Sequence, residues 1–274
     1  MEQFKGSIAI LGSGNIGVSL AKGLVKAGYA QPAQISLTRR SSHGLAALAE
    51  QGYATGTDNA AVTAQADIVV LAVLPQQLNG LLDQIRPAVD TGNGKQVFIS
   101  VASGVSCADI RSKLGENVQV VRAMPNTAIA IGQSMTCVAS DNASKENVAE
   151  VVRMFETVGS VVTINEDLMT SATALCACGI AFFLRAIRAA SQGGVEIGFH
   201  ADEALKMAVQ TAKGAADLLL QMASHPEQEI DKVTSPKGCT IAGLNEMEHN
   251  GFSSSLIKGI KLSAVKAGAL YTKE

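Results

Sequence analysis

Short apolar runs alternate with amphipathic stretches through the first 164 residues of the chain. The runs have the length and composition of buried strands, and they are SIAIL (7–11), QISL (34–37), DIVVLAV (67–73), VFISVAS (97–103), VQVVRAM (118–124), SMTCVAS (134–140) and GSVVTI (159–164). Stretches with helical periodicity lie at 41–50, 78–89, 106–114 and 144–158. This alternation predicts a doubly wound α/β domain over residues 1–164, with parallel strands and helices on both faces.

The strand pattern stops after Ile164, and helical stretches follow at 166–198, 201–223, 240–250 and 252–273. The first of them is apolar on all sides for several turns, so all of its faces must be covered. In so small a domain, another copy of the chain is the expected cover. Residues 165–274 are therefore predicted to form an all-α dimerisation domain of a homodimer or higher homo-oligomer. Burial of the helix within one monomer is the alternative.

The sequence GSGNIG (12–17) connects the first apolar run to an amphipathic helical stretch. Gly12 allows a sharp turn, Gly14 lets the backbone approach a pyrophosphate, and Gly17 lets the helix pack closely on the strand. A strand before the motif, a helix after it and a second strand at QISL are the context that it requires. The N-terminal domain is therefore predicted to be a Rossmann-like dinucleotide-binding domain.

The residues after the second predicted strand indicate which dinucleotide binds. A site for NAD usually has an acidic residue there, which accepts from the ribose 2′-hydroxyl. This chain has Thr38, Arg39, Arg40, Ser41 and Ser42. Two guanidiniums suit a 2′-phosphate, so NADP is the predicted cofactor, with NADPH preferred over NADH. A solvated turn is the alternative interpretation of the two arginines.

The segment KVTSPKGCTIAGL (232–244) joins a compact turn to the expected start of a helix. Pro236 fixes one φ angle, Gly238 permits a tight path, and Thr240 is expected to cap the helix. Backbone N–H groups at such a junction attract a small anion. The segment is therefore a candidate carboxylate site, with an ordinary helix start as the alternative.

Composition narrows the class of protein further. The net charge of −2, without a dense basic patch, argues against nucleic-acid binding as the function. The chain begins almost at once with a strand, so we expect no secretion leader, and the apolar stretch ATALCACGIAFFL (172–184) is expected to be too short for a membrane span. Five scattered cysteines predict reduced thiols and a cytoplasmic protein, and Cys176 and Cys178 lack the second pair that a zinc site needs, so no metal is predicted.

Several segments resemble the pyrroline-5-carboxylate reductase family. SPKGCT (235–240) is similar to its signature SPGGTT, DIVVLAVLPQQ to ADVVILAVKPQ, FISVASGVS to VSxAAGVS, and VRAMPNTA to RxMPNTP. Their order and spacing also agree, so the resemblance covers nearly the whole chain. It implies NADPH-dependent reduction of 1-pyrroline-5-carboxylate to L-proline, the last step of proline biosynthesis.

The family pattern also implies roles for single residues. It assigns to the cofactor Leu11, Gly12, Ser13, Gly14, Asn15, Ile16, Gly17, Arg39, Arg40, Asn59, Ala72, Val73, Leu74, Pro75, Val101 and Ala102. It assigns to the substrate Glu166, Ser235, Cys239 and Thr240, and Lys237 and Gly238 of the same turn are predicted to belong to the carboxylate site as well. The hydroxyl of Thr240 is the candidate catalytic partner for the ring nitrogen. A protonated cyclic imine is already an electrophile, so orientation matters more than a strong acid.

Besides Cys239, which stands where the signature has threonine, the chain departs from the family pattern at four places. Leu74 stands where lysine is common, Ala223 where glutamate is common, and CACGIA (176–181) replaces SGSGPA. Lys237 replaces a glycine, which is costly if that residue takes a positive φ angle. Two other classes therefore stay open: a 3-hydroxyacid type dehydrogenase with the same domain plan, and a non-catalytic dinucleotide-binding sensor.

Overall fold

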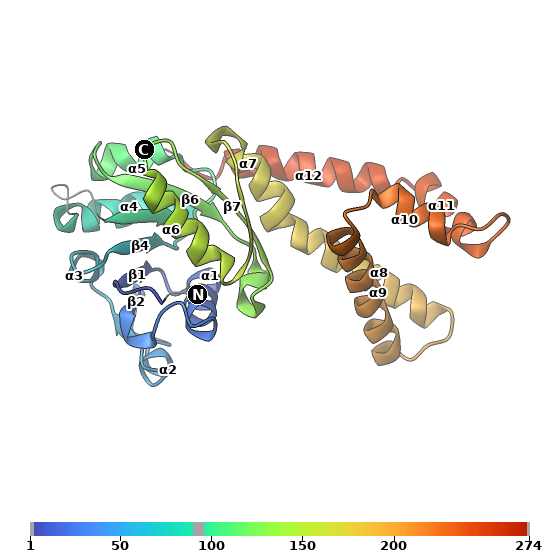
Figure 1. The fold of residues 1–274 in the computed structure, drawn as a ribbon, viewed down its shortest axis with the longest axis horizontal. Helices are drawn as coiled ribbons and strands as arrows, with labels where there is room; N and C mark the ends of the chain where they lie inside the picture. Colours follow the sequence, from blue (N-terminus) through green and yellow to red (C-terminus); the bar gives the residue numbers. More distant parts are fainter. Residues whose placement is uncertain (1–2, 90–95, 273–274) are drawn as a thin grey trace. The chain divides into compact units, whose positions relative to one another are not determined.

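The computed structural model describes residues 3–89 and 96–272, and its fold is drawn in Figure 1. The chain forms two compact units. Of the described residues, the first contains 3–89, 96–178 and 262–272, and the second contains 179–261. The sequence placed a boundary at Ile164, where the last strand ends. The residues between Ile164 and Cys178 nevertheless belong to the same compact unit as the sheet.

The first unit is built on an eight-stranded sheet in the order β3-β2-β1-β4-β5-β6-β7-β8. Its strands are β1 (Ile8–Leu11), β2 (Ile35–Thr38), β3 (Ala54–Gly56), β4 (Ile68–Leu71), β5 (Val97–Ser100), β6 (Gln119–Met124), β7 (Ser134–Ala139) and β8 (Gly159–Thr163). β1 lies between β2 and β4 and is parallel to both, with Ile8 opposite Ile35 and Ile68. β6 and β7 pair antiparallel, while β7 and β8 are parallel. The predicted Rossmann-like α/β fold is confirmed. It differs from the prediction in that β7 and β8 run antiparallel to the other strands of the sheet.

Helices cover both faces of the sheet. They are α1 (Asn15–Lys26), α2 (Ala46–Ala49), α3 (Asn59–Thr63), α4 (Pro75–Ile85), α5 (Cys107–Leu114) and α6 (Lys145–Glu156), with short 3₁₀ turns at η1 (Pro32–Gln34), η2 (Arg86–Ala88) and η3 (Thr127–Ile131). Ile8 and Ile10 pack into one apolar core with α1 and α6, while Ala9 and Leu11 pack into another with α4 and α5. Successive strand residues point to opposite faces, so one strand serves both cores.

The first unit also contains the segment that leads out of the sheet. It consists of η4 (Glu166–Leu168), α7 (Met169–Ala172) and a π-helix, η5 (Thr173–Cys178). The C-terminal part of α12 (Phe252–Gly268) belongs to this unit as well. Ala267 is buried, and its carbonyl oxygen lies close to Gly104. A Cβ added to Gly104 would be only 2.8 Å from that oxygen. The chain's last helix is therefore packed on the turn after β5.

The second unit is entirely helical. It contains α8 (Gly179–Glu196), α9 (Ala201–Met222), α10 (Pro226–Val233), α11 (Cys239–His249) and the start of α12. α8 and α9 pack closely, because a Cβ on Gly194 would lie 2.9 Å from the Cβ of Ala204. Large apolar side chains are left exposed on this unit, among them Phe183 at 61% and Leu220 at 80%. Such exposure is what a unit shows when its cover comes from another chain.

The structure differs from the sequence predictions at several short elements. β3 and α3 were missed, since neither has an apolar run, and the helix expected at 41–50 is reduced to α2. The predicted helical stretches also leave out α10, which begins at Pro226 with His225 as its N-cap residue. The Nδ1 of His225 accepts from the Glu227 N–H at 3.3 Å, and proline suits the first helical position.

Candidate functional site

A cavity of about 860 Å³ lies at the carboxyl ends of β1, β2, β4 and β5. Ligands of open α/β sheets bind at this edge, where the strand order reverses from β1 to β4. The lining residues are Gly12, Ser13, Gly14, Asn15, Ile16, Thr38, Arg39, Arg40, Ser41, Asn59, Ala72, Val73, Leu74, Pro75, Gln76, Gln77, Gly80, Leu81, Gln84, Val101, Ala102 and Ser103.

The three glycines of the first turn have three different geometries. Gly12 has a φ of +111°, and a Cβ there would lie 2.3 Å from the carbonyl oxygen of Ala72. A Cβ on Gly17 would lie 2.2 Å from the carbonyl oxygen of Gly12, so the helix could not pack on the strand. A Cβ on Gly14 would meet no described atom within 4 Å. The folded chain therefore needs Gly12 and Gly17 for packing, while Gly14 leaves open space at the cavity.

Helix α1 begins at this turn, directly beside the cavity. Gly14 is its N-cap residue, and no side chain caps the helix. The first N–H groups of a helix have no partner within it, and the helix dipole makes that end positive. An anionic group such as a pyrophosphate can accept from these donors.

Side chains at the end of β2 form a polar network in the cavity wall. The Thr38 hydroxyl donates to Asn59 Oδ1 at 2.7 Å, and Asn59 Nδ2 donates to Gln84 Oε1 at 3.0 Å. The carbonyl oxygen of Thr38 accepts from the N–H and the hydroxyl of Ser13, at 2.9 and 2.8 Å. These bonds hold the glycine turn, β2 and α4 in one arrangement.

Arg39 and Arg40 follow this network, and both are exposed. Arg39 Nη1 donates to the carbonyl of His43 at 3.1 Å, which folds the guanidinium back over the turn. Ser41 lines the cavity beside them. Two cations and a hydroxyl at this wall can bind a phosphate through charge-assisted hydrogen bonds.

The opposite wall of the cavity is largely apolar. Ala72, Val73 and Leu74 follow β4, and Val101 and Ala102 follow β5. Leu74, which replaces the lysine of the family pattern, is 63% exposed. An apolar wall of this kind can receive the face of an aromatic ring system.

The structure brings most of the predicted cofactor residues together. All of them line this cavity except Leu11, which is buried in β1, and Gly17, which packs under the turn. The sequence reasoning missed Gln76, Gln77, Gly80, Leu81, Gln84 and Ser103, which line the cavity too. Five of these residues lie in α4, the helix that follows β4, and Ser103 lies just after β5. Their position after the carboxyl end of a strand was the available signal.

The predicted carboxylate segment lies in the second unit. The N–H of Gly238 donates to the carbonyl of Ser235 at 3.0 Å, which closes a turn around Pro236 and Lys237. Lys237 has a φ of +60°, so a lysine does occupy a position that favours glycine. The predicted capping role of Thr240 was wrong: Gly238 is the N-cap residue and α11 begins at Cys239. No side chain caps this helix, and Cys239 is exposed while Thr240 is half-buried.

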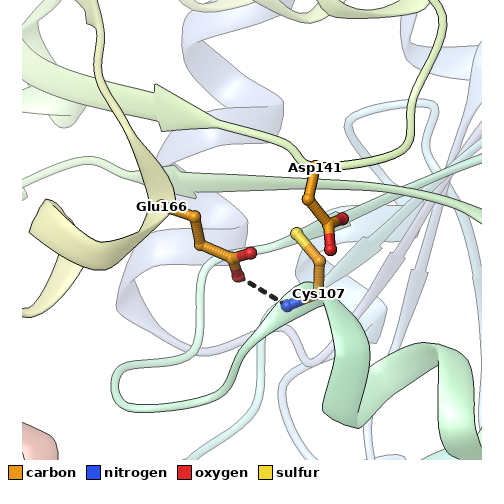
Figure 2. A group of neighbouring side chains, drawn as sticks. All are labelled: Cys107, Asp141 and Glu166. Carbon is orange, nitrogen blue, oxygen red and sulfur yellow. Dashed lines mark hydrogen bonds between the residues drawn. The ribbon is translucent and has the colours of Figure 1, made fainter.

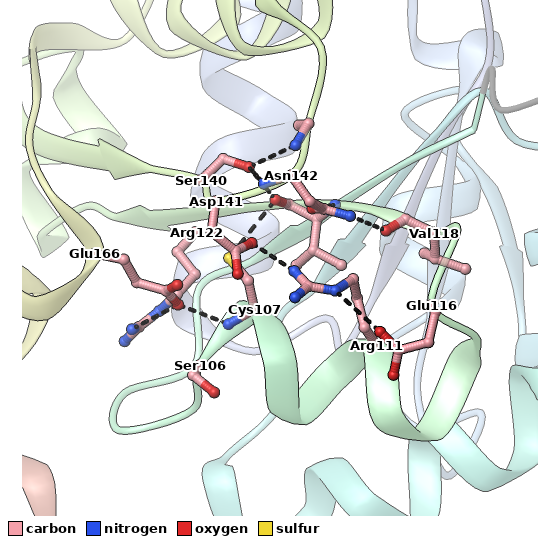
Figure 3. A network of polar contacts seen from close by, with 12 residues as sticks. Ser106, Cys107, Arg111, Glu116, Val118, Arg122, Ser140, Asp141, Asn142 and Glu166 are labelled. Carbon is pink, nitrogen blue, oxygen red and sulfur yellow. Dashed lines mark hydrogen bonds and ion pairs between the residues drawn. The ribbon is translucent and has the colours of Figure 1, made fainter.

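The other predicted substrate residue, Glu166, lies in the first unit with a set of partners (Figure 3). Its Oε1 accepts from the Cys107 N–H at 2.6 Å and lies 3.3 Å from Arg122 Nη1. Cys107 is the first residue of α5, so the carboxylate stabilises that helix end as well as the buried guanidinium. Glu166 is thus a structural anchor between η4, α5 and β6.

The side chains of Cys107, Asp141 and Glu166 point toward one another (Figure 2). Their sulfur and carboxylate oxygens lie within 4.8 Å of one another. The charges on this group are already balanced, because Arg111 pairs with Asp141 and Arg122 pairs with Glu166. Burial, together with Glu166, raises the pKa of the Cys107 thiol to about 12. A neutral thiol beside two paired carboxylates is a poor set of metal ligands, since metals bind the thiolate.

The fold and the cavity define the class of this protein: a dinucleotide-dependent oxidoreductase with a helical second region. The family described as NADP oxidoreductase, coenzyme F420-dependent, matches residues 7–104, and the family described as pyrroline-5-carboxylate reductase dimerisation matches residues 166–270. A relative from Dictyostelium discoideum, pyrroline-5-carboxylate reductase 2, is 48% identical over 95% of this chain and 92% of its own length. The chain belongs to the pyrroline-5-carboxylate reductase family.

Other similar proteins agree with this membership. Pyrroline-5-carboxylate reductase 1 of Dictyostelium discoideum is 50% identical over the whole chain, which spans about half (51%) of that relative's length. A pyrroline-5-carboxylate reductase structure from Coxiella burnetii has a TM-score of 0.88 at 28% identity, over 98% of this chain and 100% of that one. A Plasmodium falciparum pyrroline carboxylate reductase, solved with NADP bound, has the same fold, with a TM-score of 0.90 at 23% identity over 99% and 100% of the chains.

The dimerisation match also bears on the long apolar helix. Residues Glu166–Glu196 form 31 continuous helical residues, long and apolar enough to cross a membrane by length and composition. The expectation that this stretch is too short was therefore wrong. One such helix is weak evidence for a membrane span, and this one lies inside the region that matches a dimerisation family. The chain is accordingly a subunit of a homo-oligomer.

Proposed function

We propose that this chain catalyses the NADPH-dependent reduction of 1-pyrroline-5-carboxylate to L-proline. The observation that carries the proposal is a cavity with a glycine-rich turn and two arginines, in a chain of the pyrroline-5-carboxylate reductase family. The reaction is a hydride transfer to the carbon of a cyclic imine.

The residues around the cavity fit NADPH, because Gly14 leaves open space where a Cβ would otherwise stand. The pyrophosphate is assigned to the turn from Gly12 to Ile16, and the 2′-phosphate to Arg39 and Arg40. Asn59 lies on the adenosine side. The assignment is completed by Leu11 and Gly17, which hold the turn in place, and by Ala72, Val73, Leu74, Pro75, Val101 and Ala102 on the apolar wall. When bound, the cofactor supplies the hydride.

The substrate carboxylate is assigned to the turn from Ser235 to Thr240. Cys239 and Thr240, the first residues of α11, present backbone N–H groups at the uncapped start of the helix, where an anion is stabilised. Lys237 adds a positive charge, and the Thr240 hydroxyl is the proposed partner of the ring nitrogen. Glu166 contributes near the substrate through the arrangement of η4 that it anchors.

The chemistry places few demands on the side chains. The protonated imine is already an electrophile, so the chain needs to bind the ring, hold its carboxylate and exclude water rather than donate a proton through a strong acid. The exposed apolar surface of α8 and α9 supports a homodimer as the smallest folded unit. Catalysis is proposed to take place in the cytoplasm, with no nucleic-acid or membrane partner.

The test is an assay of the purified chain with 1-pyrroline-5-carboxylate and with the same ring lacking its carboxylate, each with NADPH and NADH. Oxidation of NADPH by the carboxylated ring, and much weaker oxidation by the other, is the expected result. Equal efficiency on both rings would contradict the role of the 235–240 turn. Tight NADPH binding without turnover would instead support a dinucleotide-binding sensor, and turnover of a linear 3-hydroxyacid would support the other dehydrogenase class.

A further inference from the structure

Two thiols from distant parts of the chain meet beside the sheet. The Sγ atoms of Cys137, in β7, and Cys176, in the π-helix η5, lie 3.8 Å apart. Both residues belong to the first unit, so their relative position is defined. In the sequence, Cys176 is close to Cys178 in CACGIA. In the folded chain, its sulfur contacts that of Cys137 in β7.

The backbone holds both cysteines in place. Cys137 lies opposite Met124 of β6 and Val162 of β8. The carbonyl of Cys176 accepts from Asn126 Nδ2 at 3.2 Å, which ties the π-helix to the segment after β6. A disulfide requires about 2.0 Å between sulfurs, so side-chain rotation must close roughly 1.8 Å.

The surroundings give the two thiols different roles. They lie in an apolar cluster that also contains Met124, Ala139, Ile164, Met169, Ala172 and Ala177. Cys137 is 6% exposed, whereas Cys176 is only half-buried. The contact with the Cys137 sulfur lowers the pKa of the Cys176 thiol below its ordinary value. Cys176 is therefore the thiol that meets a dissolved oxidant as a thiolate, and Cys137 is the protected second thiol.

We propose that Cys137 and Cys176 are a redox modification site, a dithiol that peroxide converts reversibly into an intrachain disulfide. The Cys176 thiolate attacks one peroxide oxygen, which breaks the O–O bond, forms a sulfenic acid and, after protonation, releases one water. The Cys137 sulfur then attacks the sulfenic sulfur and, with loss of its proton, releases the second water. Two thiols are oxidised, and one peroxide is reduced to two waters.

The disulfide would have a local structural consequence. It would join the central part of β7 to η5, the turn of π-helix that leads directly into α8. A π-helix is a less regular segment than the α-helices on either side of it. Oxidation should therefore reduce the opening of this turn, while reduction by a dithiol restores it.

The experiment uses the full chain, treated with hydrogen peroxide and analysed by intact mass and peptide mapping. We expect a loss of two hydrogen atoms in mass, two of the five thiols lost, and one cross-linked peptide pair containing Cys137 and Cys176. Dithiothreitol should reverse the change. Amide hydrogen exchange at Thr173–Cys178 should be slower in the oxidised protein.

Variants separate this pair from the other thiols. Cys176→Ser and Cys137→Ser should each abolish the cross-link, and Cys176→Ser alone carries the test if the strand variant fails to fold. Cys178→Ser and Cys239→Ser are matched controls, which should form the disulfide as the parent chain does. A link that uses Cys178, a link between two chains, or oxygen addition at Cys176 without a link would each overturn the proposal.

Discussion

The carboxylate of Glu166 lies 3.3 Å from the guanidinium of Arg122, and the two side chains are 20% and 6% exposed. The same carboxylate oxygen accepts from the first N–H of α5. The Nε and Nη2 atoms of Arg122 are buried without a hydrogen-bond partner among the described residues. Glu166 is therefore the main compensation for a buried positive charge, in addition to any role near the substrate.

Replacing Glu166 by alanine should destabilise the chain strongly. Removing one partner of a buried ion pair leaves an uncompensated charge and costs about 3–5 kcal/mol, of which we expect the lower end because Glu166 is partly exposed. Urea unfolding measures the loss. Glu146→Ala, at an exposed acidic residue of α6, is the control and should change stability by less than about 0.5 kcal/mol. Equal effects of the two variants would contradict the anchoring role.

Alanine at Gly14 and at Gly17 should have opposite effects. Gly14→Ala places its Cβ in open space, so unfolding should be almost unchanged while NADPH affinity falls. Gly17→Ala places its Cβ 2.2 Å from the Gly12 carbonyl, so it should destabilise the fold itself. Thermal unfolding and cofactor titration of both variants check this. Normal NADPH affinity in Gly14→Ala would refute the proposed pyrophosphate contact.

The double variant Arg39→Asp with Arg40→Ala should reverse the cofactor preference. Each charge-assisted hydrogen bond to the 2′-phosphate is worth about 1.5–3 kcal/mol, so kcat/KM with NADPH should fall at least about tenfold. The introduced carboxylate can accept from the ribose hydroxyl of NADH. Lys26→Ala removes a charge at the far end of α1 and should leave the ratio unchanged. An unchanged ratio in the double variant would exclude this role for the arginines.

Lys237→Gly should separate strain from charge in the 235–240 turn. A non-glycine residue at a φ of +60° is strained, so glycine should stabilise the fold by up to about 1 kcal/mol. Loss of the ammonium should also raise KM for the carboxylated imine roughly fivefold, as expected for a charge pair worth about 1 kcal/mol. Lys237→Arg keeps both the strain and the charge, so its stability and KM should match the parent chain. A KM that rises equally in both variants would argue against a charge effect.

The buried thiol of Cys107 should make stability fall at alkaline pH. Burial, and then Glu166, raise its pKa in the folded chain from 9.0 to about 12. Between these values the unfolded chain loses the thiol proton and the folded chain keeps it, so stability is complete below pH 9 and declines as the pH rises. The slope from one proton is about 1.4 kcal/mol per pH unit. Cys107→Ala should reduce the slope measured by urea unfolding, and Cys239→Ala, at an exposed position, is the control.

Patterns of neighbouring residues in the sequence predicted most of the strands and the glycine turn. The seven predicted apolar runs are all strands. Six of them are largely buried, which requires near-continuous apolar residues, while β8 lies at the sheet edge and is partly exposed. The spacing of Gly12, Gly14 and Gly17 predicted a turn whose geometry the structure shows residue by residue. Short elements such as β3 were missed because its three residues lie partly exposed near the sheet edge and have no apolar pattern. The roles of single residues in binding stay predictions that the proposed experiments test.

The sequence by itself determined the α/β fold of the N-terminal part, the glycine turn and the two arginines beside it, since each depends on residues that are close in the chain. Only the tertiary structure decided the antiparallel pairing of β6 with β7, the ion pair of Arg122 with Glu166 and the contact of Cys137 with Cys176. The ion pair joins residues 44 apart and the two thiols are 39 apart. The two strands are closer in the chain, but no local periodicity records which element will pair with which, or in which direction. Packing of the whole sheet and its covering helices brings them together, because burial and hydrogen bonding are satisfied jointly rather than one segment at a time.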